Sequence, residues 1–453
     1  MSDTQQMDVI VIGTGGGAKL IRPLANMGYR VMAIDSGRLG GTCLNHGCIP
    51  SKMLIYPADV VREMQAAGSA NVVGVPPDIR FTELSQRVSQ TVDAESDQIE
   101  PIYRQHPNIT LVRGHARFVA PRVIEVNQQR VTAPFIAIVT GSESVIPPIP
   151  GLESIPYITH KEALRLTTLP PRLVIIGGGY IALEMAHFFS ASGSEVTVVT
   201  RGDILSGMDS DLRDRYRQLV SPHIQLIPNA SIESVQANGD IQVNLNQPSG
   251  LKTVRGDQLL VATGMTPRIR DLGLDAGHII HENGQIVVDQ RLSTSVEGVV
   301  AFGDVIGPPY FRHKANYEGE YLFKHRFEKP SALPITYPPM PYALFGHPPI
   351  AGVGIMEQNA TGPIIVGRAE IRSSAFGMAM NRQDGFVKLI FDAKTHALLG
   401  AHGVGIQTPS MMHMPIAFLK MNATLHDMLD TIYIHPALPE VIRNAVRNAA
   451  SQI

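Results

Sequence analysis

The sequence has only two cysteines in 453 residues, a net charge of −2 and no long apolar run. The near-zero charge argues against nucleic acid or an anionic membrane as the main partner. No apolar run approaches the roughly 18 residues of a membrane helix. The polar start, residues 1–8, carries acids where a signal peptide carries basic charge. We therefore expect a cytoplasmic protein with no nucleic-acid or membrane partner, and the length predicts about three domains.

The two cysteines, Cys43 and Cys48, lie close together. A structural disulfide gains more from closing a long loop than from closing one this short. Four intervening residues do not match a CxxC zinc half-site, and no second pair completes four thiolate ligands. The spacing therefore favours a dithiol that cycles with its disulfide, provided that the chain also carries an electron source. No metal site is predicted, because the Met411-Met412-His413-Met414 run is more typical of helix core and surface.

The N-terminal segment has the pattern of a dinucleotide site. An apolar run at 8–12 breaks into Gly13-Thr14-Gly15-Gly16-Gly17-Ala18, a helix-like stretch follows, and a second apolar run at 30–34 ends in Asp35. Strand, glycine turn, helix, strand and acid in this order are the dinucleotide fingerprint. The glycines let a pyrophosphate approach a helix N-terminus, and Asp35 can accept hydrogen bonds from ribose hydroxyls.

The same pattern recurs in the middle of the chain, so two dinucleotides are expected. An apolar run at 173–176 leads into Gly177-Gly178-Gly179-Tyr180, and the next strand, 195–199, ends in Thr200-Arg201 without an acid. An arginine at this place suits a 2′-phosphate, which favours NADPH while NADH stays possible.

Two further apolar strands, one after each glycine motif, are each followed by a Thr-Gly pair. Strands at 136–139 and 259–262 are followed by Thr140-Gly141 and Thr263-Gly264. Asp304 follows another apolar strand and a glycine, where an acid can hold a polyol hydroxyl. These positions predict the ends of two related units.

Taken together, these motifs resemble the class I flavin-dependent pyridine nucleotide–disulfide oxidoreductases, such as dihydrolipoamide dehydrogenase, glutathione reductase, mycothione reductase and mercuric reductase. The resemblance covers the whole chain in order, including 40–52 around the cysteines and the C-terminal His435-Pro436-Ala437-Leu438-Pro439-Glu440. It implies an α/β fold with two Rossmann-like dinucleotide-binding domains, for FAD and NAD(P), and a C-terminal α+β dimerisation domain. The expected domains are 1–150 for FAD, 151–264 for NAD(P), 265–335 as a central segment completing the FAD site, and 336–453 as the interface domain.

The resemblance also implies roles in the reaction. Hydride passes from the nicotinamide through the flavin to Cys48, the flavin-side thiol, while Cys43 is the interchange thiol that attacks the substrate disulfide. The enzyme is expected to be a homodimer in which His435 of one chain serves the cysteines of the other, since imidazole titrates near neutral pH. Glu440 would fix the tautomer of that imidazole.

Further residues are assigned to the cofactors by the same resemblance. Lys52 and Glu184 are expected to pair beside flavin N5, and Tyr180 to cover the nicotinamide side of the ring. The expected cofactor-binding residues are Gly13, Gly15, Ala18, Asp35, Gly41, Thr42, Lys52, Thr140, Gly141, Gly177, Gly179, Tyr180, Arg201, Gly264, Asp304 and Ala315. A protonated His46, between the cysteines, would lower a thiolate pKa; the alternative is a side chain that points into solvent.

The substrate is left open. Residues 313–319 look like lipoamide dehydrogenase, whereas 435–441 look closer to mycothione reductase, so lipoamide and a low-molecular-weight thiol disulfide such as mycothione are both candidates. Arg201 argues against a strictly NAD-linked lipoamide enzyme. A mercuric-type metal-ion reductase is an alternative, although such enzymes use an extra C-terminal cysteine pair that this chain lacks. A flavoprotein subunit of a multienzyme complex is another.

Overall fold

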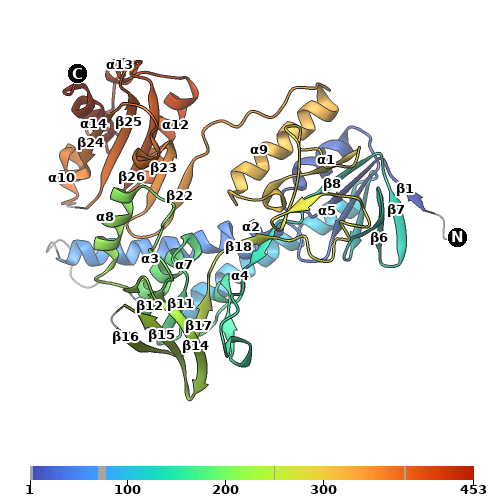
Figure 1. The fold of residues 1–453 in the computed structure, drawn as a ribbon, viewed down its shortest axis with the longest axis horizontal. Helices are drawn as coiled ribbons and strands as arrows, with labels where there is room; N and C mark the ends of the chain where they lie inside the picture. Colours follow the sequence, from blue (N-terminus) through green and yellow to red (C-terminus); the bar gives the residue numbers. More distant parts are fainter. Residues whose placement is uncertain (1–3, 70–77, 249, 382–383) are drawn as a thin grey trace. The chain divides into compact units, whose positions relative to one another are not determined.

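The structure, a computed structural model, describes residues 4–69, 78–248, 250–381 and 384–453. Residues 1–3 of the polar start lie outside this range. Tertiary contacts divide the chain into two units: Met1–Met53, Ser85–Ile146 and Gly264–Thr336 form one, and Leu54–Leu84, Pro147–Thr263 and Tyr337–Ile453 form the other (Figure 1). The four domain boundaries expected from the sequence stay a prediction. Among the described residues, no helix is both long and apolar enough to cross a membrane.

The first unit is built on a five-stranded parallel sheet in the order β21-β8-β2-β3-β4. The strands are β2 (Val9–Ile12), β3 (Val31–Asp35), β4 (Ile109–Arg113), β8 (Phe135–Ile138) and β21 (Val299–Ala301). Helices α1 (Ala18–Asn26) and α9 (Arg312–Phe323) lie side by side (Figure 1) and pack on the face that includes Val9 and Val11. Ile10 and Ile12 pack on the opposite face. Burial on both faces explains why β2 is an unbroken apolar run.

Shorter elements complete this unit. A four-stranded sheet in the order β1-β7-β6-β5 contributes to the core on the Ile10 face. Helices α3 and α4 each have residues in both units. The elements are β1 (Gln5–Gln6), α2 (Gly41–His46), α3 (Cys48–Ser69), α4 (Phe81–Asp97), α5 (Ile99–Gln105), β5 (Arg117–Ala120), β6 (Val123–Val126), β7 (Gln129–Thr132), β9 (Ser142–Ser144), β18 (Met265–Pro267), β19 (His281–Glu282), β20 (Gln285–Ile286), the 3₁₀ helix η2 (Gly303–Ile306) and the π-helical turn η3 (Lys324–Glu328).

The second unit contains a second parallel sheet, in the order β10-β17-β11-β12-β13. Its strands are β10 (Tyr157–Ile158), β11 (Arg172–Ile176), β12 (Glu195–Val199), β13 (Gln225–Ile227) and β17 (Gln258–Val261). Helix α7 (Tyr180–Ala191) follows β11 and is buried along most of its length, which its apolar composition requires. Also present are η1 (Leu152–Ser154), α6 (His160–Ala163), α8 (Ser210–Val220) and the antiparallel sheet of β14 (Ser231–Asn238), β15 (Asp240–Gln247) and β16 (Gly250–Gly256).

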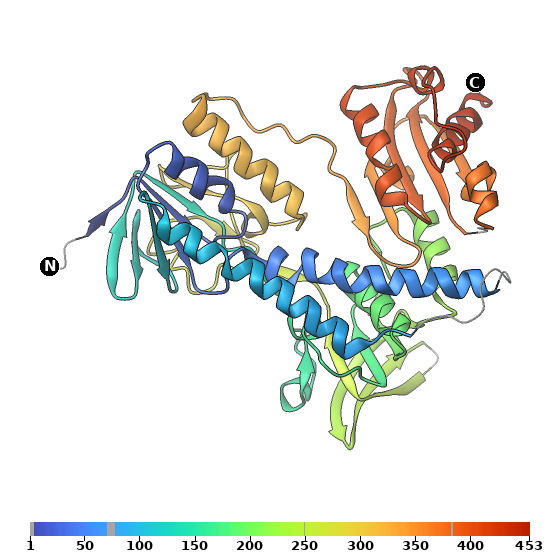
Figure 2. The ribbon, with the colours of Figure 1, turned by 180° about the vertical axis from the view of Figure 1, so that it is seen from behind.

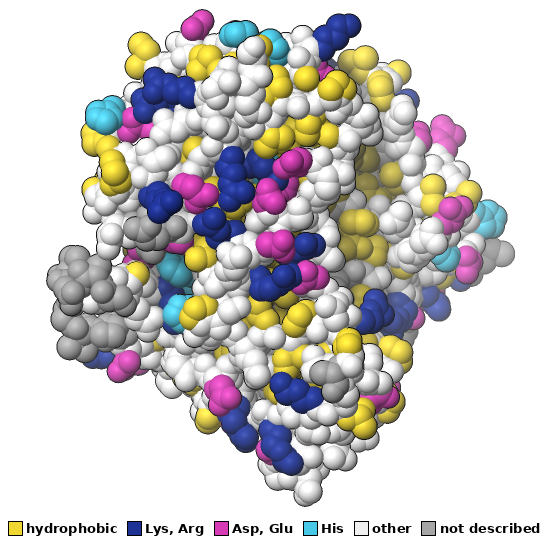
Figure 3. Space-filling view, turned by 60° about the vertical axis from the view of Figure 1, so that its left-hand side comes forward, with side chains coloured by type: hydrophobic (Ala, Val, Ile, Leu, Met, Phe, Trp, Pro, Cys, Tyr) yellow, Lys and Arg dark blue, Asp and Glu magenta, His cyan; other side chains and the backbone are white. Residues whose placement is uncertain are grey.

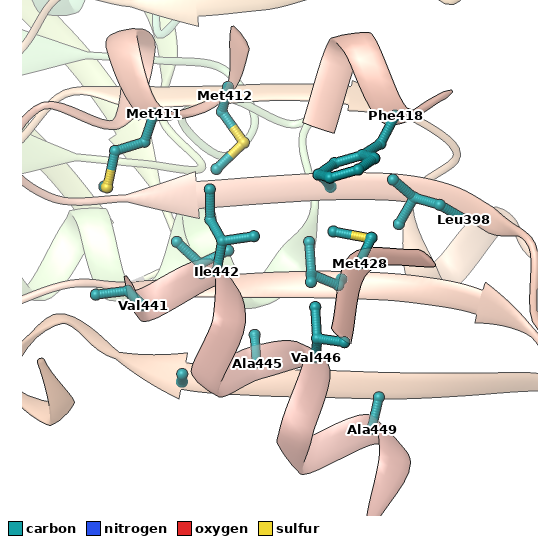
Figure 4. Close-up of a cluster of buried hydrophobic side chains, with 14 of the residues drawn as sticks. Leu398, Met411, Met412, Phe418, Met428, Val441, Ile442, Ala445, Val446 and Ala449 are labelled. Atoms are coloured by element: carbon teal, nitrogen blue, oxygen red, sulfur yellow. The ribbon is translucent and has the colours of Figure 1, made fainter. Parts of the chain in front are cut away.

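The C-terminal part of this unit is an antiparallel sheet covered by helices (Figure 2). The strand order is β22-β23-β26-β25-β24, and α14 (Glu440–Ala450) packs on β24 and β25. Met411 and Met412 are buried in the apolar core of this region (Figure 4), as their interpretation as helix core predicts. The elements are β22 (Tyr342–Leu344), β23 (Ile350–Gly354), η4 (Glu357–Asn359), β24 (Ile364–Glu370), η5 (Ile371–Ser373), α10 (Ala375–Ala379), β25 (Phe386–Asp392), β26 (Leu398–Val404), α11 (Thr408–Met411), α12 (His413–Lys420) and α13 (Leu425–Leu429).

The surface shows the mixed charge that the net value of −2 leads one to expect. Figure 3 shows basic and acidic side chains interspersed over the face that it draws.

The strand orders and helices described above make the fold α/β, with two Rossmann-like sheets and a C-terminal α+β region.

Candidate active site

The first glycine loop lies at the carboxyl end of β2. Gly13 has a φ of +104°, and a Cβ there would lie 2.2 Å from the carbonyl oxygen of Val139. A Cβ on Gly15 would lie 3.2 Å from Cα of Gly41, so this loop touches the start of α2. Only glycine fits the contact at Gly13, and a side chain at Gly15 would require Gly41 to shift. The loop leads directly into α1 at Ala18, whose N-terminal N–H groups suit the pyrophosphate of a dinucleotide.

Asp35 ends β3 beside this loop. Its Oδ2 accepts hydrogen bonds from the backbone nitrogen of Thr14 at 2.8 Å and from the Thr14 hydroxyl at 2.6 Å. Its Oδ1 accepts from the backbone nitrogen of Gly37 at 2.9 Å. A carboxylate has about four acceptor sites, so Asp35 can also accept from a ribose hydroxyl. Thr14 was not predicted from the sequence, although its place within the glycine run was a signal.

Asp304 lies in η2, directly after β21. Its Oδ2 accepts a hydrogen bond from the Ser142 hydroxyl at 2.5 Å. Burial raises the pKa of the Asp304 carboxyl, while that hydrogen bond and the charges of Lys314 and Arg312 oppose the rise. Ser142 was also missed from the sequence; it directly follows the predicted Thr140-Gly141 pair.

The other expected cofactor-binding residues of the first unit lie on turns and on α9. Thr140 donates a hydrogen bond to the carbonyl of Arg268 at 2.7 Å. Gly141 and Gly264 have φ values of +75° and +128°. Ala315 is buried on α9, 3.3 Å from the position that a Cβ on Gly303 would take. Together with the glycine loop and Asp35, these residues fit a bound FAD, because they combine close backbone approach with acids near polyol hydroxyls.

The two cysteines lie on successive helices. Cys43 belongs to α2, with Gly41 and Thr42 in the same turn, and Cys48 begins α3. Buried Asn45 holds this segment, because its Nδ2 donates to the carbonyl oxygens of Leu39 at 2.8 Å and Gly41 at 3.0 Å. The Cys43 side chain is partly exposed and that of Cys48 is exposed, as reactive thiols require.

The two thiols hold their protons unequally. A hydrogen bond with Cys48 lowers the pKa of Cys43 to about 6 against the effect of burial, and the charges of Arg312 and Lys52 add to the lowering. The same hydrogen bond, together with burial, raises the pKa of Cys48. These opposite shifts favour Cys43 over Cys48 as the thiolate of the pair. The role of His46 stays a prediction.

The second glycine loop repeats the first one's geometry. Gly177 has a φ of +128°, and a Cβ there would lie 2.1 Å from the carbonyl oxygen of Ala262. Gly179 caps α7, which begins at Tyr180. Arg201 lies just after β12 and its side chain is exposed to solvent. A second dinucleotide with a charged group near Arg201 fits this loop.

Helix α7 carries the other two residues expected near the nicotinamide. Burial raises the pKa of Tyr180 to about 12. Glu184 is buried and accepts a hydrogen bond from the backbone nitrogen of Phe345 at 3.1 Å. Lys52 belongs to the other unit, so its pairing with Glu184 stays a prediction.

His435 and Glu440 form a hydrogen-bonded pair. Nδ1 of His435 lies 2.9 Å from Oε1 of Glu440, and Oε2 accepts from the backbone nitrogen of Ala437 at 3.1 Å. The hydrogen bond with His435 is the main cause of the lowered pKa of Glu440, and Arg443, 2.8 Å away, adds to it. With Nδ1 held by the carboxylate, Nε2 is the nitrogen left to exchange protons. The His435 side chain is 67% exposed, while that of Glu440 is 2% exposed.

Comparison with known families agrees with this geometry. The family model for pyridine nucleotide-disulphide oxidoreductases matches residues 7–319, and the dimerisation-domain model of the same family matches residues 340–446. The chain belongs to the pyridine nucleotide-disulphide oxidoreductases. The sequence-based predictions of family, fold class and reaction class are thus confirmed: the protein is an FAD-dependent oxidoreductase with a dimerisation domain.

Individual relatives cover nearly the whole chain. Mycothione reductase of Mycobacterium tuberculosis is 33% identical over 455 residues, spanning 97% of this chain and 98% of the relative. Dihydrolipoyl dehydrogenase of Haloferax volcanii is 32% identical over 463 residues, spanning 98% and 96%. A Cu(II) complex of RclA, the HOCl-induced flavoprotein disulfide reductase of Escherichia coli, is 27% identical with a TM-score of 0.86, and the match covers 96% of this chain and 99% of RclA.

Proposed function

We propose that this enzyme reduces small-molecule disulfides at Cys43 and Cys48 with electrons from NADPH. The observation that carries the proposal is the position of Cys43 and Cys48 on successive helices, the first of which begins against the glycine loop of the first unit. The pKa shifts, lowered at Cys43 and raised at Cys48, agree with it. Lipoamide and a low-molecular-weight thiol disulfide such as mycothione are the candidate substrates. Similarity to mycothione reductase and dihydrolipoyl dehydrogenase supports both.

The thiol chemistry follows from the positions of the protons. Bound FAD supplies the route by which the electron pair of the nicotinamide nucleotide reduces the Cys43–Cys48 disulfide. The Cys43 thiolate then attacks one sulfur of the substrate, so that a mixed disulfide forms and the substrate S–S bond breaks. Cys48 then gives up its proton and attacks the Cys43 sulfur, so that the Cys43–Cys48 disulfide re-forms and the second substrate sulfur leaves as a thiolate that takes up that proton. In sum, one NADPH and one proton convert one disulfide into two thiols.

Both proton transfers need a group that exchanges protons near neutral pH. We assign this role to His435 of the partner subunit, which protonates the first leaving thiolate and then accepts the proton of Cys48. The exposed His435 is flanked by Ile432 and Ile434, which are 97% and 79% exposed. Exposed apolar side chains beside a buried carboxylate partner suit a surface that a second subunit covers. Glu440 keeps Nε2 available, and a Lys52–Glu184 pair with Tyr180 completes the proposed cofactor environment.

A turnover assay tests the reaction. The purified flavoprotein is assayed anaerobically with NADPH or NADH against lipoamide, glutathione disulfide and mycothiol disulfide. Cu(II) is included as an acceptor because the similar RclA structure is a Cu(II) complex. We expect turnover with one of the disulfides, lost in Cys43→Ser while the flavin is still reduced by NADPH. Disulfide turnover that survives this substitution, or turnover with Cu(II) alone, would contradict the proposal.

The nucleotide preference is tested at Arg201. We expect Arg201→Gln to raise KM for NADPH about tenfold, corresponding to a lost charge-assisted contact, and to leave KM for NADH unchanged. Arg213, which pairs with Asp203 and Asp214 on the same unit, supplies the control substitution. Equal rates with both nucleotides in the unaltered enzyme would refute the role of Arg201.

The shared active site is tested by mixing two inactive variants. Cys43→Ser and His435→Gln homodimers are each expected to lack turnover. Subunit exchange at equal amounts should restore about a quarter of the activity, because half of the dimers then hold one complete site out of two. No recovery after verified exchange would mean that His435 acts within its own chain or not at all. Gel filtration of the same samples would show any docking to a larger complex.

A further inference from the structure

Arg312 occupies an electrostatically unfavourable place in the fold. It is the first residue of α9, and the first turn of that helix contains no acidic residue. A positive charge at a helix N-terminus opposes the helix dipole by a few tenths of a kcal/mol to about 1 kcal/mol. The rings of Phe311 and His313 stack beside it with centroids 5.0 Å apart, which holds the start of the helix in place. The helix itself does not favour the charge of Arg312, so its favourable partners lie on other segments, and Asp304 is one of them.

The guanidinium points at the junction of the glycine loop and the cysteine helix. The position that a Cβ on Gly15 would take lies 3.8 Å from Nη1 of Arg312 and 3.2 Å from Cα of Gly41. Gly41 begins α2, and Cys43 belongs to the same helical turn. The guanidinium is thus within a few ångströms of the turn that carries the nucleophilic thiol. Its side chain is partly buried there, so water screens its charge less than at an open surface.

The charged groups around Cys43 come from three helices and one turn. Cys48 and Lys52 face it from α3, Arg312 faces it from α9, and His46 lies on α2 itself. Asp304, in η2, interacts electrostatically with Arg312. Of the two cations that favour the Cys43 thiolate, Arg312 has the larger effect.

We propose that Arg312 is a positioning residue that holds the Cys43 thiolate ready for attack on the substrate disulfide. The inference rests on the proposed function, in which Cys43 is the nucleophile. A fixed guanidinium keeps its charge at every pH at which the protein is folded. Arg312 would thereby keep Cys43 reactive independently of the protonation state of His435.

The test measures the Cys43 thiolate directly, without any disulfide substrate. The holoenzyme is reduced anaerobically by two electrons, alkylated with iodoacetamide across a range of pH, and the Cys43 peptide is quantified by mass spectrometry. Arg312→Gln removes the charge and Arg312→Lys keeps it. Arg117→Gln is the control, because Arg117 is an exposed cation on β5 of the same unit, paired with Glu125. FAD affinity and the Cys48 peptide are measured in each variant.

We expect the midpoint of Cys43 alkylation to rise by about half a pH unit or more in Arg312→Gln, which slows alkylation about threefold on the acid side. Arg312→Lys should shift the midpoint by less than half as much, and Arg117→Gln should not shift it. The Arg312→Gln shift should persist in a His435→Gln background. An unchanged midpoint in Arg312→Gln, with or without loss of FAD affinity, would overturn the proposal, as would equal midpoints in Arg312→Gln and Arg312→Lys. Because the assay contains no substrate, its result does not depend on whether the proposed disulfide reduction is correct.

Discussion

Lys388 is expected to be the largest single electrostatic contributor to the stability of the C-terminal sheet. It lies on β25 with its side chain 1% exposed, and its Nζ is 2.7 Å from Oδ1 of Asp209, 2.8 Å from Oε2 of Glu357 and 3.1 Å from Oδ2 of Asp211. Burial disfavours the charged lysine, but the hydrogen bonds to Asp209 and Glu357 outweigh this and raise its pKa. The lysine is therefore charged in the folded protein.

The magnitude depends on what its removal leaves behind. Glu357 and Asp211 are 43% and 44% exposed, so water can solvate them when Lys388 is replaced. Asp209 is 0% exposed; its Oδ1 contacts Lys388, and its Oδ2 has no hydrogen-bond partner among the described residues. Lys388→Met leaves this buried carboxylate without a counter-charge, which costs about 3–5 kcal/mol. Asp209→Asn keeps an oxygen to cap α8 and should cost only about 1–2 kcal/mol.

Urea unfolding of the holoenzyme, with hydrogen exchange of β24–β26 peptides, measures these effects. Adding Asp209→Asn to Lys388→Met should recover about 1–3 kcal/mol, because the unpaired charge is then gone. Lys394→Met, an exposed lysine after β25, is the control and should change stability by less than about 0.5 kcal/mol. A loss below about 1 kcal/mol in Lys388→Met, or no recovery in the double variant, would refute the reasoning.

Three further substitutions test the site. Gly41→Ala places a Cβ 2.5 Å from Cα of Gly15 at a φ of +70°, so FAD affinity, measured by flavin fluorescence, should fall. Gly28→Ala is the control and should leave FAD affinity unchanged, because Gly28 also has a positive φ, +92°, but no atom lies within 4 Å of its Cβ position. Glu440→Gln should reduce disulfide turnover about a hundredfold or more, by analogy with triad carboxylates, without changing flavin reduction; normal turnover would contradict the tautomer argument. Cys48→Ala removes the main hydrogen bond to Cys43, so the midpoint of Cys43 alkylation should move from about 6 toward 9.0. An unchanged midpoint would show that the thiol hydrogen bond is not the cause.

The sequence predicts best those features that depend on residues close together along the chain. The apolar run that becomes β2, the glycines after it and Asp35 at the end of β3 lie within 27 residues, and steric limits at Gly13 and Gly15 allow few other residues there. The second loop repeats the pattern at Gly177 because the same contact with a neighbouring strand recurs. His435 and Glu440, five residues apart, were paired through the family resemblance, and the structure places Nδ1 of His435 2.9 Å from Oε1 of Glu440.

Apart from Thr14, which lies within the local glycine pattern, the missed residues belong to contacts between distant segments. Ser142 and Asp304 are 162 positions apart, and Lys388 and Asp211 are 177 apart. Neither pair has a recurring spacing, so only the tertiary fold brings the partners together. Arg312 was part of a basic run in the sequence, but its proximity to the cysteine helix depends on how α9 packs beside α1.

The unequal thiols also bear on why the proposed site needs two subunits. A thiolate on Cys43 is ready to attack, but the cycle can close only after Cys48, with its raised pKa, gives up a proton. Lysine and arginine side chains do not ordinarily act as bases near neutral pH, so another type of residue must accept that proton. The required base is an imidazole, and the one with a buried carboxylate behind it, His435, is presented outward on an apolar loop. Under the proposed mechanism, Lys52 and Arg312 favour the reactive Cys43 thiolate within one chain. Turnover, in contrast, requires His435 of the partner subunit.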